Sequence, residues 1–152
     1  MKAMFIFFLL SIVASTNLLS SAETTEEIVF IVNSENPISQ LTTNDISDYY
    51  FKRKRIWPNL ENVRFIDRSP ENSLRHYFLK NVLKKSRGEV EQFWIGQKLY
   101  TGDSAPLGES TDQGTIKFCS SFKGALGYIS PTSVTALTNK NVKTIKVESK
   151  GD

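Results

Sequence analysis

The stretch FIDRSPENSLRHYF, residues 65–78, joins a short apolar strand directly to the start of a helix. The apolar residues of the segment 63–66 predict the strand. Ser69 is a favourable N-cap, and Pro70 fits the first helical position, where a missing N–H costs nothing. The predicted helix runs from Pro70 to about Lys84. Its apolar positions recur at helical spacing, at Leu74, Tyr77, Phe78 and Val82.

This junction places Arg68 at the end of a strand and beside a helix N-terminus. Free backbone N–H groups and the positive end of the helix dipole would meet a guanidinium there, a combination that holds phosphate, sulfate or carboxylate. Two interpretations remain open. The junction is an anion site, or Arg68 pairs with a nearby carboxylate and Ser69 only caps the helix.

The N-terminal residues 1–22 have the pattern of a cleavable secretory signal. Lys2 supplies a positive charge, residues 5–14 form an apolar run, and Ser20-Ser21-Ala22 is a small-residue cleavage site. The run is too short to span a bilayer, and no cysteine lies near the cleavage site to carry a lipid anchor. We therefore expect a periplasmic or secreted protein with a single domain at residues 23–152.

Length and composition exclude several classes of function. The chain has 152 residues with 39% hydrophobic content, which suits one globular domain, and its net charge of +3 gives no indication of nucleic-acid binding. Cys119 and His76 are the only residues of their types, which argues against a disulfide, a zinc site or a Cys/His nucleophile pair. The apolar neighbours of Cys119 predict a buried, inert thiol. The carboxylates show no spacing that indicates paired acid and base, so neither an enzyme nor a cofactor is predicted.

Strands and helices alternate along the chain in a way that predicts an α/β fold, with helices covering a mixed, mainly parallel sheet. In such sheets ligands bind at the carboxyl ends of strands, where Arg68 and Ser69 fall. Capping boxes are predicted at Thr42/Asp45, Ser86/Glu89 and Ser110/Gln113. The predicted strands span 28–33, 63–66, 124–129 and 142–147; the predicted helices span 43–51, 70–84, 86–98 and 110–122; a loop is predicted at 100–108 and a helical turn at 131–137.

Four motifs in this order resemble the phosphate ABC transporter substrate-binding proteins, and in particular small single-lobe members of the type II periplasmic-binding-protein fold. The resemblance covers about residues 28–147 and implies an α/β lobe with an oxyanion such as phosphate as ligand. The motifs are IVFIVNSENPISQLTTNDISDYYF (28–51), WPN (57–59), FIDRSPENSLRHYF (65–78) and GALGYI (124–129).

Carried across position by position, the resemblance matches Arg68 to the arginine that grips phosphate in the family. Asn72, Ser73 and Leu74 stand in place of the family's Ser-Gly-Thr cradle. Leu74 has no hydroxyl group, and Ser73 carries a side chain where glycine lets the backbone approach. The resemblance thus implies Arg68, Ser69, Asn72 and Ser73 as the ligand-binding residues.

The chain has room for one lobe, whereas full transport receptors close two lobes around the ligand. Each charge-assisted hydrogen bond lost with the second lobe costs roughly 1.5–3 kcal/mol, so we expect weak binding. A homodimer is one candidate for the missing wall, and an ABC permease is one candidate partner.

The alternative hypothesis is an interaction module that has lost its ligand. In this hypothesis the chain docks a protein or an envelope component through the cations Lys52 to Arg55 and the loop at Trp57. A solvated surface is the simpler interpretation of the four cations.

Overall fold

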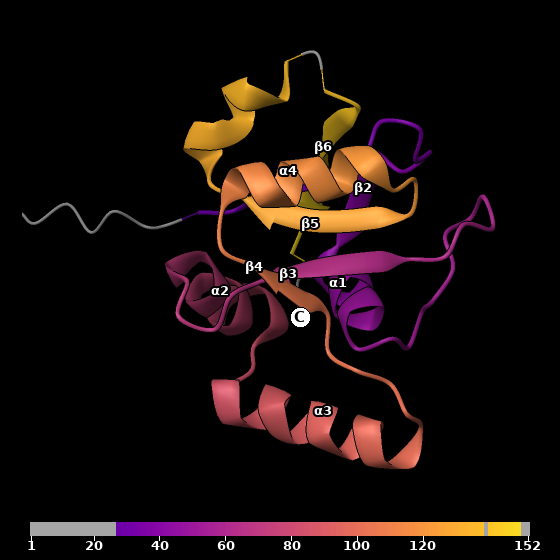
Figure 1. Ribbon diagram of the computed structural model, residues 1–152, viewed down its shortest axis with the longest axis vertical. Helices are drawn as coiled ribbons and strands as arrows, with labels where there is room; N and C mark the ends of the chain where they lie inside the picture. Colours follow the sequence, from indigo (N-terminus) through magenta and orange to yellow (C-terminus); the bar gives the residue numbers. More distant parts are fainter. Residues whose placement is uncertain (1–26, 139, 150–152) are drawn as a thin grey trace, which may run out of the picture.

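The computed structural model describes residues 27–138 and 140–149, so the predicted secretory signal lies outside the described residues. Within them, six strands form one sheet in the order β2-β6-β1-β5-β3-β4 (Figure 1). The strands are β1 (Val29–Asn33), β2 (Gln40–Thr42), β3 (Arg64–Arg68), β4 (Leu107–Glu109), β5 (Ala125–Ile129) and β6 (Val142–Glu148). The helical segments are α1 (Thr43–Tyr50), α2 (Ser73–Tyr77), the π-helical η1 (Phe78–Leu83), α3 (Arg87–Tyr100), α4 (Asp112–Ser121) and the 3-10 segment η2 (Pro131–Leu137).

The sheet is mixed, with more parallel than antiparallel pairings, as the sequence predicts. β3 runs parallel to both β4 and β5, and β2 runs parallel to β6. β1 pairs antiparallel with β5 and β6 and is covered on both faces, which fits its unbroken apolar sequence. The predicted α/β fold is therefore confirmed.

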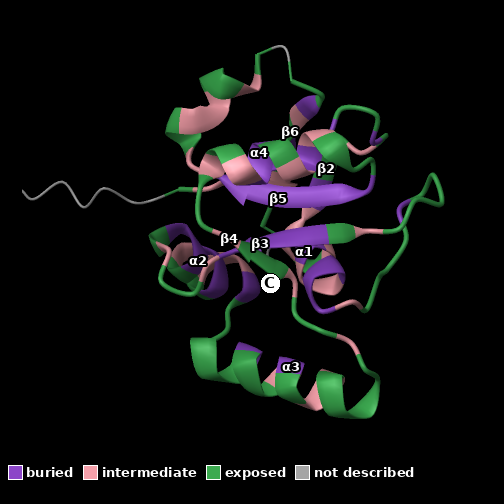
Figure 2. Cartoon of the chain, viewed as in Figure 1, coloured by how far each residue is buried: buried purple, intermediate pink, exposed green. Residues whose placement is uncertain are grey.

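The side chains of the central strands alternate between two apolar clusters, one on each face of the sheet. Figure 2 shows β5 and most of β3 as buried. On one face Phe30 and Tyr128 pack with α1, α2, η1 and α3; on the other, Ile31 and Ile129 pack with Cys119 of α4. The predicted burial of Cys119 is confirmed. No helix among residues 27–138 and 140–149 is long and apolar enough to cross a membrane.

Two of the three predicted capping boxes are present. The hydroxyl of Thr42 accepts from the N–H of Asp45, whose carboxylate accepts from the Thr42 N–H, and Ser86 and Glu89 make the same exchange at the start of α3. The third prediction, Ser110 with Gln113, is wrong. Thr111 is the N-cap of α4, and its hydroxyl accepts from the N–H of Gly114 at 3.0 Å.

The helix after β3 begins three residues later than predicted. Asn72, not Ser69, is the N-cap, and its side-chain oxygen accepts from the N–H of Leu74 at 2.9 Å. Between β3 and α2 the chain makes a turn in which the N–H of Asn72 donates to the carbonyl of Ser69 at 2.9 Å. Pro70 therefore lies in this turn rather than in the first helical position.

The sequence does not predict β2 and β4, because each strand has only three residues and no apolar pattern. β2 lies at one edge of the sheet, and β4 lies at the other edge, inside the segment 100–108 that was predicted to be a loop. β4 pairs with β3 from Ile66↔Leu107 to Arg68↔Glu109. This pairing brings the residues that follow β4 next to Arg68.

Candidate functional site

Arg68 is the last residue of β3, and its side chain is 3% exposed. Its guanidinium Nη1 donates to the carbonyl of Thr111 and to the hydroxyl of Thr115, both at 2.6 Å, and its Nη2 pairs with the carboxylate of Asp112. Among the described residues, the buried Nε of Arg68 has no hydrogen-bond partner. The carboxylate pairing that the sequence left open is thus present, and it ties the end of β3 to the first turn of α4.

Two carboxylates lie at the N-terminus of α4, where the helix dipole favours negative charge. Asp112 accepts from Arg68 and also from the N–H of Ser130 at 3.2 Å and the hydroxyl of Ser133 at 2.6 Å. Glu109 accepts from the N–H of Ser110 at 2.8 Å and from that of Thr111. The protein's own carboxylates therefore occupy part of the donor set that an anion would use.

Three of the four predicted ligand-binding residues line one open polar pocket of about 370 Å³ at the carboxyl end of β3. Asn72 caps α2 and also donates from Nδ2 to the carbonyl of Ser110 at 3.2 Å. Ser69 is not part of the lining, but its hydroxyl lies 2.9 Å from that of Ser110. The lining residues are Arg68, Asn72, Ser73, Leu74, Ser110, Thr111, Asp112, Gln113, Ser130 and Ser133.

Most of the lining that the sequence did not identify comes from two later segments, 110–113 and 130–133. In the sequence, Ser110 and Gln113 predict a capping box, which gives the polar run 110–112 no role in a ligand site. Its proximity to Arg68 depends on the β3–β4 pairing, for which there is no local signal.

A buried polar network lies beside the pocket and is centred on Asp67, which is 3% exposed. Its carboxylate accepts from the hydroxyl groups of Tyr50 at 2.9 Å and Tyr128 at 2.5 Å, from Nε of Arg75 at 3.0 Å, and from the Arg68 N–H at 2.7 Å. Burial, and then the Asp67 charge, raises the pKa of both tyrosines. Because Arg75 is committed to this network, it does not add a cation to the pocket.

The fold of this chain is similar to that of several solved structures. PstS from Borrelia burgdorferi superposes with a TM-score of 0.64 at 16% sequence identity, covering 84% of this chain and 49% of that one. An ABC-type phosphate transport receptor from Vibrio cholerae gives a TM-score of 0.57 at 18% identity, covering 80% and 46%. The fold is that of PstS-like periplasmic binding proteins. This chain spans about half the length of these neighbours. Neither protein-family models nor curated proteins match the sequence.

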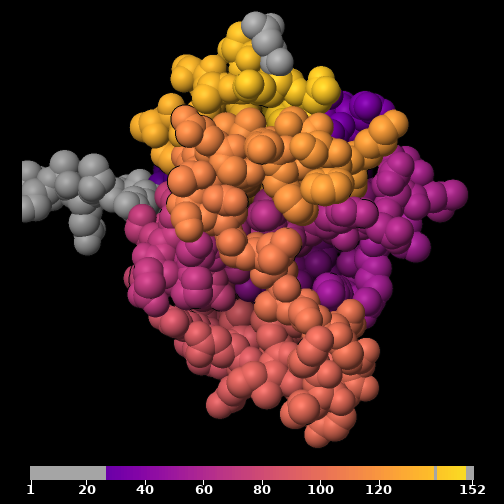
Figure 3. Space-filling model, in the orientation of Figure 1, coloured from indigo at the N-terminus to yellow at the C-terminus, as the bar shows by residue number. Residues whose placement is uncertain are grey.

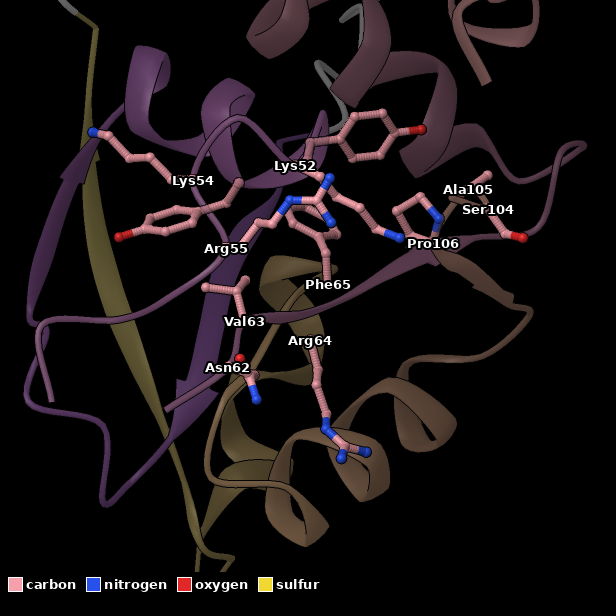
Figure 4. A pocket seen from close by; sticks show the side chains of 12 residues that line it. Lys52, Lys54, Arg55, Asn62, Val63, Arg64, Phe65, Ser104, Ala105 and Pro106 are labelled. Carbon is pink, nitrogen blue, oxygen red and sulfur yellow. The ribbon is translucent and has the colours of Figure 1, made fainter. Parts of the chain in front are cut away.

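Three of the four cations of residues 52–55, Lys52, Lys54 and Arg55, line a second pocket of about 350 Å³ (Figure 4). Lys52 and Arg55 both pair with Asp103, at 3.3 and 2.6 Å. Arg53 and Lys54 pair with aspartates of α1, at 2.7 Å each. Trp57, which the docking hypothesis also used, is 1% exposed and donates from Nε1 to the carbonyl of Gly124 at 3.0 Å. Its ring is therefore part of the core and offers no docking surface.

Proposed function

We propose that this protein is a secreted, non-catalytic binding domain that binds an oxyanion such as phosphate weakly in the pocket beside Arg68. The observation that carries the proposal is the position of Arg68, a buried arginine at the carboxyl end of a central strand. Hydroxyl and amide groups from three separate segments of the chain meet it in one pocket. The fold neighbours, a PstS and a phosphate transport receptor, support the ligand class.

Arg68 would supply the charge for the ligand, and Asn72, Ser73 and Ser110 would supply neutral donors. The guanidinium already donates to Asp112, to the carbonyl of Thr111 and to the hydroxyl of Thr115. An incoming anion competes with these partners and meets the negative charge of Asp112, so the net gain from each hydrogen bond is small. The pocket is also open to water, which weakens every charge interaction in it. Both features point to low affinity.

Calorimetric titration with phosphate and then sulfate tests the proposal. The unmodified chain should give saturable heat, and Ser110→Ala and Arg68→Ala should reduce it. Ser120→Ala is the matched control, because this serine lies on the same helix as Asp112 and is not part of the pocket lining, and its hydroxyl donates to the carbonyl of Lys117. It should bind like the unmodified chain.

Thermal unfolding of each variant separates loss of binding from loss of fold, since Arg68→Ala also breaks a buried ion pair. Unchanged binding by folded Arg68→Ala would show that the site is elsewhere. Absence of heat at millimolar phosphate and sulfate would refute the function itself. The mass in solution, with and without phosphate, tests whether a second copy supplies the missing wall.

A further inference from the structure

The C-terminal half of α3 carries large apolar side chains that the domain leaves uncovered. Ile95 is 62% exposed, Leu99 is 77% exposed and Tyr100 is 89% exposed. α3 lies at one end of the molecule, away from the sheet (Figure 1), and it forms the lower end of the surface in Figure 3. These three side chains are therefore open to solvent at this end of the molecule.

An apolar groove of about 390 Å³ runs along this part of α3. It is lined by Trp94, Ile95, Lys98, Leu99, Ser104 and Ala105. Ser104 and Ala105 also line the cationic pocket of Figure 4. The same short segment thus has an apolar groove on one side and a cationic pocket on the other.

The cations next to the groove outnumber the acids that pair with them. Lys52 and Arg55 share the single carboxylate of Asp103, and the Lys52 Nζ lies 5.7 Å from the ring centre of Trp94. Lys98 donates to the hydroxyl of Ser104 at 3.2 Å and has no ion pair among the described residues. Three cations therefore face one carboxylate beside the exposed apolar side chains.

Other charged side chains near this end of the molecule form ion pairs, except Lys80 and Lys84, which have none among the described residues and line a separate pocket beside the start of α3. The exposed Glu91 of α3 pairs with Arg87 one turn toward the helix N-terminus, at 2.7 Å. Arg53 and Lys54 pair with Asp48 and Asp45. Unpaired positive charge thus lies near both ends of α3, and at its C-terminal half it lies beside exposed apolar side chains.

We propose that this end of the molecule binds the surface of an anionic lipid bilayer. Ile95, Leu99 and Tyr100 enter the headgroup region, where a tyrosine can keep its hydroxyl in water. Lys52, Arg55 and Lys98 contact the lipid phosphates. Apolar area and positive charge add in this mode of binding, because each nearby cation gains from the negative surface potential. This site is separate from the oxyanion pocket and does not depend on it.

Co-sedimentation of the full chain with vesicles tests the proposal, using phosphatidylcholine with roughly one third phosphatidylglycerol. The apolar run at residues 5–14 is the same in every variant, so the ratio of partition coefficients between variants is the measured quantity. Ile95→Ser/Leu99→Ser should bind about tenfold more weakly than the unmodified chain. The matched control is Leu60→Ser, which removes a leucine that is 84% exposed in the loop before β3 and should change nothing.

Lys98→Glu should weaken binding to these vesicles and leave binding to pure phosphatidylcholine unchanged. Equal partition of the double serine variant and the unmodified chain would overturn the proposal. Competition by soluble glycerol phosphate would also overturn it, because that result assigns the cations to a small anion rather than to a surface.

Discussion

Replacing Asp67 by asparagine should destabilise the protein strongly, because Asp67 is the acceptor for four donors in the core. Two tyrosine hydroxyls, the Arg75 guanidinium and a backbone N–H converge on its two oxygens. Asparagine keeps one acceptor oxygen, places an NH₂ group against donors, and leaves Arg75 buried without its counter-charge. Breaking a buried ion pair in this way costs about 3–5 kcal/mol.

Urea unfolding followed by tryptophan fluorescence at pH 7 measures this loss. Tyr128→Phe removes one hydrogen bond to the carboxylate and leaves the ion pair with Arg75, so it should cost roughly 1.5–3 kcal/mol. Asp48→Asn makes the same chemical change in an exposed ion pair with Arg53 and should cost less than about 1 kcal/mol. If Asp67→Asn were no more destabilising than Asp48→Asn, the network would not be the source of stability that its geometry indicates.

Three further predictions concern packing, acid stability and thiol reactivity. Gly127→Ala would place a Cβ 2.6 Å from a methyl carbon of Ile66 in a packed core, so thermal unfolding should show a loss of roughly 1–3 kcal/mol; an unchanged midpoint would contradict this. The hydrogen bond from Lys54 lowers the pKa of Asp45 to about 2. The contribution of the ionised Asp45 to the free energy of unfolding is therefore full above about pH 4 and is lost as the pH falls toward 2. Asp45→Asn should cost about 1 kcal/mol at pH 7 and should reduce this acid dependence in urea titrations. Burial raises the pKa of the Cys119 thiol to about 12, so Ellman's reagent at pH 8 should label it only as the protein unfolds, and rapid labelling of folded protein would contradict its burial.

The parts of the fold that could be predicted from sequence are those with a local signal. The capping boxes at Thr42 and Ser86 identify where their helices begin, because both partners of each box lie within one helical turn. The unbroken apolar run of β1 predicts a strand covered on both faces.

The candidate site was harder to predict, because its partners are distant in sequence. Ser69 and Asn72 are equally good caps by type, and both side chains contact Ser110, about forty residues away in the sequence. The pairing of Arg68 with Asp112 spans more than forty residues and depends on β4, a three-residue edge strand with no apolar pattern. A short polar strand that is stabilised by its neighbour leaves no periodicity to detect.

The pairing of β1 has a consequence for the order in which the chain can fold. β1 is the first strand made, yet both of its neighbours are late: Val29 pairs with Ile129, and Phe30 pairs with Ile145. A chain that emerges from the ribosome N-terminus first therefore keeps β1 without its sheet partners until β5 and β6 have been synthesised. Closing such long loops is slow, so folding is a single late event. The secretion that we propose would use this late folding, because an export channel passes unfolded chains.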